Sequence, residues 1–468
     1  MMFHRNRAGA VLIIAAAWTA ILAAIAAAAL GIIQRHHRHA YQIASWHAAL
    51  GAAESGVDMA VTELRKSLRG GTSWVGWTQT TGPSGATYTS NVMLRPGEAG
   101  QRAWVVVQVD APPGLLSPTG DQWYRVRSFG YAEVPGGAVA TGEDVDRKLR
   151  KIDFRVDRLT GASVADPRAF RVVEAIVKPI GAFRVAMLGG TSLDLSNLDV
   201  AVDSYDSMDP DKSTDGYYDP AKRQKHGDIA TNGVTLDAAN AHIFGSAATN
   251  GGEVLNASNV TGEIQNDFYQ ELLPVMRPTM VAEPGSPTTV RDNTTLTAKA
   301  GAPAQFILSD IHLNYDQVLH IKGAGDGSDT YAQIVVNGNL RIRGNSQIVI
   351  DPGVHVRVFV AGNATLTGRG VSNPGAPINF QFYGMDRPPG EPPGSLQIAD
   401  TGSFRGAVYA PNYDIQLTGG DSADSFFGGF VGRSVRLSNV QTLHYDEALA
   451  TAGLISDYRV VSWMEQVR

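Results

Sequence analysis

Hydrophobic side chains run without interruption through the start of the chain. Residues 10–33 carry no charged side chain and consist of Ala, Leu, Ile and Val with single Trp, Thr and Gly residues. At ~1.5 Å per residue such a helix extends ~36 Å, enough to cross the ~30 Å hydrocarbon core of a bilayer. The run also exceeds the ~7–15 apolar residues of a cleaved secretory signal. It predicts a retained transmembrane helix over 10–33, after a short basic leader at 1–9.

The helical pattern continues past the apolar run as an amphipathic extension over residues 34–70. Apolar residues recur there every three or four positions, which is typical of one buried helix face. Gly70 and Gly71 then end the pattern in the manner of a helix C-cap. We therefore expect one rod of about 60 residues, with its first half in lipid and its second half packed on a soluble domain. The expected stripe comprises Ile43, Trp46, Leu50, Ala53, Val57, Val61, Leu64 and Leu68.

Strand patterns replace the helical pattern after residue 71. Residues 72–160 contain a buried apolar run at 103–109 and alternating segments at 123–128 and 152–156, separated by Pro- and Gly-rich turns. A helix followed by such a meander predicts a small antiparallel β domain whose sheet the helix covers. Residues 451–468 are expected to form a closing strand.

Imperfect repeats appear in residues 165–468. ATNG occurs at 230–233 and 248–251, GNLRIRG at 338–344 is echoed by GNATLTG at 362–368, and Leu417 matches Leu437 in a third pair. Spacings of roughly 18–24 residues fit the coils of a β-solenoid. Gly and Asn would occupy its corners, where positive φ is needed. A β-sandwich built from similar hairpins is the alternative. A Pro-bearing stretch near 273–303 is expected to be a linker or crossover.

Composition narrows the class of protein. The chain has 468 residues, 39 Lys and Arg against 45 Asp and Glu, and a net charge of −6. This balance argues against a nucleic-acid partner, which usually requires a basic face. No cysteine is present, which excludes disulfides, zinc–thiolate sites and thiol catalysis. The Lys and Arg residues flanking the apolar run are balanced, so charge does not decide its orientation.

The N-terminal region resembles pilins. RNRAGAVLIIAAAWTAILAAIAAAALG is similar to a class III prepilin leader and helix, and AYQIASWHAALGAAESGVDMAVTELRKSL resembles PilX-type minor pilins and the large K-type pseudopilin of type II secretion. The resemblance implies cleavage by a prepilin peptidase at Gly9, before Ala10. Ile14 stands where most pilins have Glu. The implied partners are inner-membrane lipid, the prepilin peptidase and other pilin-like subunits, bound through the N-terminal helix.

The C-terminal region resembles the domain often found behind PilX-type N-termini. Five segments carry this resemblance, in the order VDSYDS (202–207), GDIATNG (227–233), FVAGNATLTG (359–368), FRGAVYAPN (404–412) and HYDEAL (444–449). It implies a right-handed β-helical domain that is exposed on the bacterial surface or pilus. The bulk of the chain would then be periplasmic or extracellular, and a surface glycan or host-cell ligand is the expected partner.

Two groups of acidic residues are candidates for a metal site and a catalytic site. Asp209, Asp211, Ser213 and Asp215 resemble a Ca²⁺ loop, but Lys222 stands where a bidentate Glu is required. A solvated Asp-rich loop is the plainer interpretation, and no cofactor is expected other than this candidate Ca²⁺. Paired carboxylates could serve a carbohydrate-active enzyme. The candidates for that role are Asp400, Asp414, Asp421 and Asp424.

The sequence favours a structural protein over an enzyme. His444 between strands is interpreted as structural, since no Ser-Gly elbow accompanies it. The favoured hypothesis is a non-enzymatic minor pilin-like subunit of a type IV pilus or secretion pseudopilus, displaying an adhesive β-helical domain. A membrane-anchored envelope protein that never enters a filament is the main alternative, and a tethered carbohydrate-active enzyme is a third. The predicted fold is mainly β, with a long N-terminal helix, an antiparallel sheet and a β-solenoid-like domain.

Overall fold

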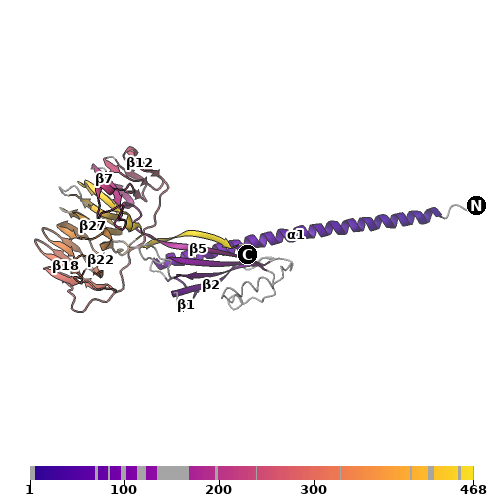
Figure 1. Cartoon of the computed structure of the whole chain (residues 1–468), viewed down its shortest axis with the longest axis horizontal. Coiled ribbons are helices and arrows are strands. Elements are labelled where there is room, and N and C mark those ends of the chain that lie inside the picture. The colour runs from indigo at the N-terminus through magenta and orange to yellow at the C-terminus, as the bar shows by residue number, and fades with distance from the viewer. Residues whose placement is uncertain are drawn as a thin grey trace, which may run out of the picture.

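The computed structural model describes one long helix, one antiparallel sheet and a large body of parallel strands (Figure 1). This confirms a mainly β protein with a long N-terminal helix. The described residues are 6–68, 72–82, 85–95, 102–112, 123–133, 168–195, 199–238, 240–326, 328–400, 403–419, 426–451 and 455–466.

Helix α1 (Asn6–Leu68) is a single element of 63 residues. Its first half extends away from the rest of the protein, and its second half lies on the antiparallel sheet (Figure 1). The expected stripe is buried at Ala53, Val57 and Leu64. It is wrong at its start, because Ile43 and Trp46 are 51% and 48% exposed. α1 already contacts the sheet at Ser45, which is buried and donates to Glu133 O, so these two side chains lie outside the buried face of the helix.

The antiparallel sheet has six strands in the order β1–β2–β3–β4–β5–β30. Valines and alanines on one face of it form a buried core with α1. The two backbones approach closely, since a Cβ on Gly130 would lie 1.9 Å from the carbonyl oxygen of Ala49. The strands are β1 (Thr78–Gly82), β2 (Gly85–Arg95), β3 (Ala103–Asp110), β4 (Tyr124–Glu133), β5 (Arg168–Gly181) and β30 (Ile455–Gln466).

This sheet combines strands that precede the parallel body in the sequence with one strand, β30, that follows it. It also includes β5, which begins after the domain boundary expected at residues 160–165. β5 pairs with β4, and β30 pairs with β5, both antiparallel. The closing strand expected at 451–468 therefore exists as β30 but completes the first sheet. Pairing across such a distance leaves no local pattern in the sequence. The strand expected at 152–156 lies outside the described residues.

The parallel body contains a 20-stranded and a 4-stranded sheet. The repeats noted in the sequence occupy neighbouring strands in register: Ala230 pairs with Ala248, Leu340 with Ala364 and Leu417 with Leu437. Hairpins would give antiparallel pairs, so the pairing is not that of a hairpin-built sandwich. Aliphatic and aromatic side chains of successive strands form one continuous core.

The strands of the larger sheet are β6 (Met187–Asp194), β7 (Val200–Tyr205), β8 (Ile229–Thr231), β9 (Thr235–Asp237), β10 (Ala241–Ile243), β11 (Ala247–Ala248), β12 (Glu253–Leu255), β13 (Ile264–Gln265), β14 (Thr289–Val290), β16 (Ala304–Leu308), β17 (Asp310–Leu313), β19 (Thr330–Val336), β20 (Leu340–Ile342), β22 (Val354–Val360), β23 (Ala364–Gly368), β25 (Phe380–Gly384), β26 (Gly394–Asp400), β27 (Phe404–Thr418), β28 (Phe426–Ser438) and β29 (Thr442–Asp446). The smaller sheet contains β15 (Thr294–Thr297), β18 (Val318–Lys322), β21 (Gln347–Ile350) and β24 (Gly370–Ser372). Four 3₁₀ helices are η1 (Pro220–Lys222), η2 (Ala257–Asn259), η3 (Pro377–Asn379) and η4 (Glu447–Ala450).

The first strand of the parallel body along the chain, β6, lies in the middle of that body. β6 pairs with β8 on one side and with β28 on the other, so the strands form two arms that meet at this point. The first arm ends at β13, and the second runs from β14 back to β29. Residues 268–288 cross between the arm ends without a strand, a shorter crossover than the 273–303 expected. Hydrogen bonds hold this crossover to the body: Gln270 Nε2 donates to Ala182 O at 2.9 Å, and the Tyr409 hydroxyl donates to Leu273 O at 2.9 Å.

Candidate functional site

The first half of α1 exposes apolar side chains on all sides. Trp18, Leu22 and Ile25 are each at least 60% exposed. Within the described residues, α1 is the one helix long and apolar enough to cross a membrane. Exposed apolar surface of this extent marks a site of contact with lipid or protein. We call residues 14–33 of α1 the bare segment.

The expected cleavage site lies inside this helix. α1 begins at Asn6, so Gly9 and Ala10 both have helical backbone. Their side chains are outside the described set. Cleavage between them stays a prediction.

A second feature is a buried polar cluster where the two arms meet. β29 pairs with β7 so that His444 lies opposite Asp203. His444 Nδ1 lies 2.5 Å from Asp203 Oδ1, and both residues are 3% exposed. The Tyr218 hydroxyl donates to Asp203 Oδ2 at 2.8 Å, while the Tyr218 ring stacks on the His444 ring at 3.7 Å. These contacts bring the VDSYDS and HYDEAL segments side by side.

Asp446 continues this cluster. Its carboxylate accepts hydrogen bonds from Ser207 N at 2.9 Å, Ser207 Oγ at 2.7 Å and Ala448 N at 3.2 Å. Burial raises the pKa of Asp446 to about 6, although the bonds from Ser207 act in the opposite direction. Asp446 thus joins the loop after β7 to the first turn of η4.

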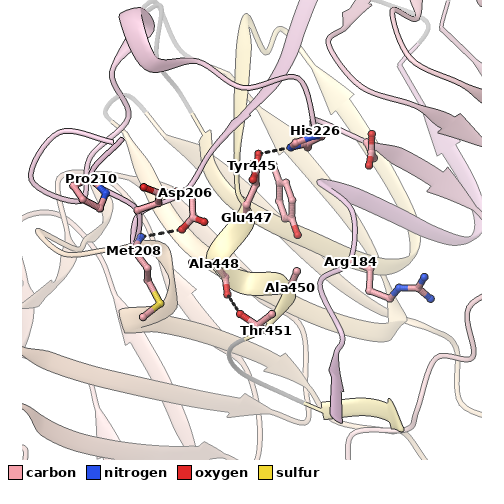
Figure 2. A pocket seen from close by; sticks show the side chains of 12 residues that line it. Arg184, Asp206, Met208, Pro210, His226, Tyr445, Glu447, Ala448, Ala450 and Thr451 are labelled. Atoms are coloured by element: carbon pink, nitrogen blue, oxygen red, sulfur yellow. Dashed lines mark hydrogen bonds and ion pairs between the residues drawn. The ribbon is translucent and has the colours of Figure 1, made fainter. Parts of the chain in front are cut away.

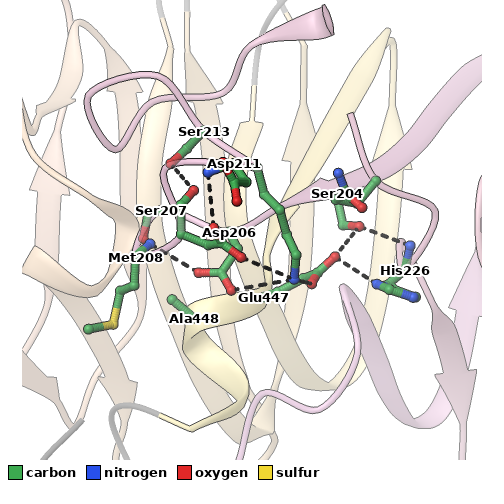
Figure 3. A network of polar contacts seen from close by, with 12 residues as sticks. Ser204, Asp206, Ser207, Met208, Asp211, Ser213, His226, Glu447 and Ala448 are labelled. Atoms are coloured by element: carbon green, nitrogen blue, oxygen red, sulfur yellow. Dashed lines mark hydrogen bonds and ion pairs between the residues drawn. The ribbon is translucent and has the colours of Figure 1, made fainter. Parts of the chain in front are cut away.

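Glu447 forms the outer part of the cluster (Figure 3). It accepts from Ser204 Oγ at 2.8 Å and lies 2.8 Å from His226 Nδ1 and 3.3 Å from Lys212 Nζ. A serine, a histidine and a carboxylate therefore lie together, as in a hydrolytic triad. The Ser204 hydroxyl, however, donates to Glu447 and accepts from the backbone N–H of His226. An imidazole that activated the serine would have to contact Oγ with its ring. This arrangement fixes loops and does not form a nucleophile–base pair.

A cavity of about 610 Å³ opens beside the cluster, near the chain's entry to and exit from the parallel body (Figure 2). Its walls carry both acidic and basic groups, so it could hold a small polar ligand. It is lined by Arg184, Asp206, Met208, Asp209, Pro210, His226, Asp228, Tyr445, Glu447, Ala448, Ala450 and Thr451.

Protein groups engage several oxygens of the expected Ca²⁺ loop. Asp209 Oδ1 accepts from Asp211 N at 3.0 Å, and Ser213 Oγ donates to Asp209 O at 2.8 Å. The ammonium of Lys222 donates to Pro210 O at 2.7 Å and to Ser213 O at 2.6 Å. Asp215 has a positive φ of 53°. Within the described part of the chain no three His, Asp or Glu side chains converge as metal ligands.

Of the four carboxylates that are candidates for glycan chemistry, the structure describes one side chain, that of Asp414. Asp414 forms an ion pair with Arg433 and accepts from the Ser434 hydroxyl. Asp421 and Asp424 lie outside the described residues, and of Asp400 only the backbone is described. The buried Asp203, His444 and Asp446 were not found as a group from the sequence. The two motifs that carry them are about 240 residues apart, as the His444–Asp203 pair shows.

Comparison with known proteins covers part of the chain. Residues 284–452 match a family described as a domain of unknown function, DUF7305. This range begins just before β14 and ends just after η4, so it covers the second arm and leaves out the first. The chain matches no curated protein and no solved structure.

Proposed function

We propose that this chain is a structural, non-enzymatic minor pilin-like subunit. Its bare segment holds it in the bacterial inner membrane and then packs among the helices of other subunits in a type IV pilus or secretion pseudopilus. The bulk of the chain faces the periplasm or the exterior. Prepilin peptidase processes it between Gly9 and Ala10.

The division of α1 into two environments carries this proposal. The bare segment exposes Trp18, Leu22 and Ile25, which is unfavourable in water at ~25 cal/mol per Å² of apolar surface. The same helix buries Val57 and Leu64 against the antiparallel sheet. One rigid rod thus joins a segment that requires lipid or helices to a folded body. Alanine, the commonest residue of the bare segment, allows helices to approach closely.

We propose further that the parallel body is a right-handed β-solenoid that serves as an adhesive display domain. In-register parallel pairs at related spacings support it, such as Thr330 with Val354 and Leu340 with Ala364. A solenoid stacks each coil on the next and thereby presents a long side surface. A surface glycan or a host-cell ligand is the partner expected there.

A membrane-anchored envelope protein that never enters a filament is the second candidate. Ile14 favours it, because most pilins carry Glu at this position. Both candidates use the bare segment, but only the first requires processing and extraction from the membrane.

The two candidates are separated by fractionating cells into sheared filaments, inner membranes and soluble material, then determining the first residue of the chain. The pilin-like proposal expects a chain that starts at Ala10 in the filament fraction. A Gly9→Leu variant should stay in the membrane, and Gly51→Leu, outside the bare segment, should be processed and fractionate as the wild type, since nothing lies within 4 Å of a Cβ at Gly51. An intact N-terminus found exclusively in membranes would contradict the proposal.

A further inference from the structure

Five consecutive cationic or titratable residues follow the apolar run on α1. They are Arg35, His36, His37, Arg38 and His39, and all five are exposed. We call them the collar. Within the described residues, the ring of Tyr41 on the same helix stacks on the ring of His37, with the two ring centroids 6.5 Å apart.

The collar encircles the helix. At ~3.6 residues per turn, five successive side chains point in all directions around the axis. Arg35 and Arg38, three residues apart, lie on one face of the helix, and the imidazoles cover the rest of its circumference. Polar side chains on every side fit a layer of headgroups that surrounds the helix.

The length of the collar matches one layer of a membrane. Five helical residues rise ~7.5 Å. The hydrocarbon core is ~30 Å thick and the whole bilayer ~40–45 Å, which leaves ~5–7.5 Å for the headgroups of each leaflet. Because the collar begins two residues after Ile33, it lies at headgroup depth when the bare segment spans the core. The first hydrogen bond from α1 to the sheet, Ser45 Oγ to Glu133 O at 3.0 Å, lies a few residues farther out.

The charge around the collar has one sign. No Asp or Glu occurs before Glu54, so Arg35 and Arg38 have no acidic neighbour on this part of the helix. Basic residues next to a membrane attract anionic lipids with about a fivefold effect each.

We propose that the collar binds the headgroups of anionic phospholipids and that the bound lipids help to retain the subunit in the membrane. The inference rests on the membrane-held state of the proposed function. Extraction into a filament would require the collar to release these lipids.

The absence of cysteine allows a direct test, because a Gln34→Cys variant of the full chain accepts one fluorophore beside the collar. The labelled protein is reconstituted in phosphatidylcholine vesicles containing a minor fraction of quencher-labelled phosphatidylglycerol. A matched set contains quencher-labelled phosphatidylcholine. We expect several-fold stronger quenching by phosphatidylglycerol, with a decrease as salt is added.

Two sets of variants assign the effect. Arg35→Gln with Arg38→Gln should remove most of the preference for phosphatidylglycerol, whereas Arg341→Gln with Arg343→Gln, exposed in the parallel body, should leave it unchanged. Equal quenching by the two lipids, or a preference that survives loss of both collar arginines, overturns the proposal.

A carbonate wash of the same vesicles separates this outcome from failure of the proposed function. Protein that resists the wash but shows no lipid preference contradicts the collar alone. Protein that the wash removes contradicts the membrane anchor and the collar together.

Discussion

The bare segment and the polar cluster depart in opposite directions from the usual distribution of side chains in a soluble domain. The bare segment exposes Leu22 and Ile25, while the cluster buries Asp203 and Asp446. The cluster satisfies its polar groups within the protein, through hydrogen bonds from Tyr218, Ser207 and Ala448. The described part of the chain does not cover the apolar side chains of the bare segment. Buried polarity here serves the fold, and exposed apolarity points to an external partner.

Removing a carboxylate from the cluster should have the largest effect. Asp203→Ala leaves His444 and the Tyr218 hydroxyl without their buried acceptor, and we expect the free energy of unfolding to fall by about 3–5 kcal/mol. Urea unfolding of the full chain, followed by far-UV circular dichroism, measures this. The matched variant Asp199→Ala removes a carboxylate that is 87% exposed and paired with His242, and it should cause no measurable change. Equal effects of both variants would show that the cluster does not stabilise the fold.

A charge introduced into the bare segment should weaken membrane insertion and leave the stability of the folded body unchanged. Ala24→Arg should cost about 2.5–3.5 kcal/mol of membrane insertion, because it places a cation near the centre of the apolar run. Resistance to carbonate extraction from membranes should fall, while the urea unfolding curve of the body stays as in the wild type. A shift of the unfolding curve would mean that the bare segment packs on the body.

Replacing glycine by alanine at two positions in the docked half of α1 should change the stability of the protein in opposite directions. A Cβ at Gly56 would lie 2.2 Å from Ser128 Oγ, and one at Gly51 meets nothing within 4 Å. Gly56→Ala should therefore destabilise by about 1–3 kcal/mol through overpacking. Gly51→Ala should stabilise by about 0.5–1 kcal/mol through helix propensity. Thermal denaturation of both variants checks the signs, and a common sign would contradict the docking of α1 described above.

The last effect is the dependence of stability on pH. Burial raises the pKa of Asp446 to about 6 in the folded protein, above the ordinary 3.8 of an aspartate, so the folded state keeps this proton to a higher pH than the unfolded state. Its contribution is fully present below pH ~4 and is lost as the pH rises through ~6, by about 1–3 kcal/mol. Asp446→Asn should remove this slope from the curve of stability against pH. An unchanged slope in the variant would place its origin elsewhere.

Local patterns in the sequence predicted much of this architecture. Helix α1, the strand at 103–109 and the paired repeats follow from periodicity, since each depends on residues close in the chain. The exposed Ile43 and Trp46 do not, because the periodicity of apolar residues does not reveal that the buried face begins at the small polar Ser45.

Contacts between distant segments explain what sequence patterns could not predict. The pairing of β5 with β30 joins residues nearly 300 positions apart, and the pairing of β6 with β28, where the chain enters the parallel body, joins residues about 240 positions apart. His444 illustrates the same point in the cluster. Its structural role was expected, but its partners Asp203 and Tyr218 come from a segment that no local spacing relates to it.

The central claim, that lipid or neighbouring helices cover the bare segment, is tested most directly by alkylation of single cysteines in cells. Ile21→Cys lies in the bare segment, 50% exposed in the isolated chain, and Tyr315→Cys lies in the parallel body, where Tyr315 is 82% exposed. We predict that a water-soluble maleimide labels position 315 and leaves position 21 unlabelled until detergent is added. Equal labelling of both positions in intact membranes and in sheared filaments would contradict the account.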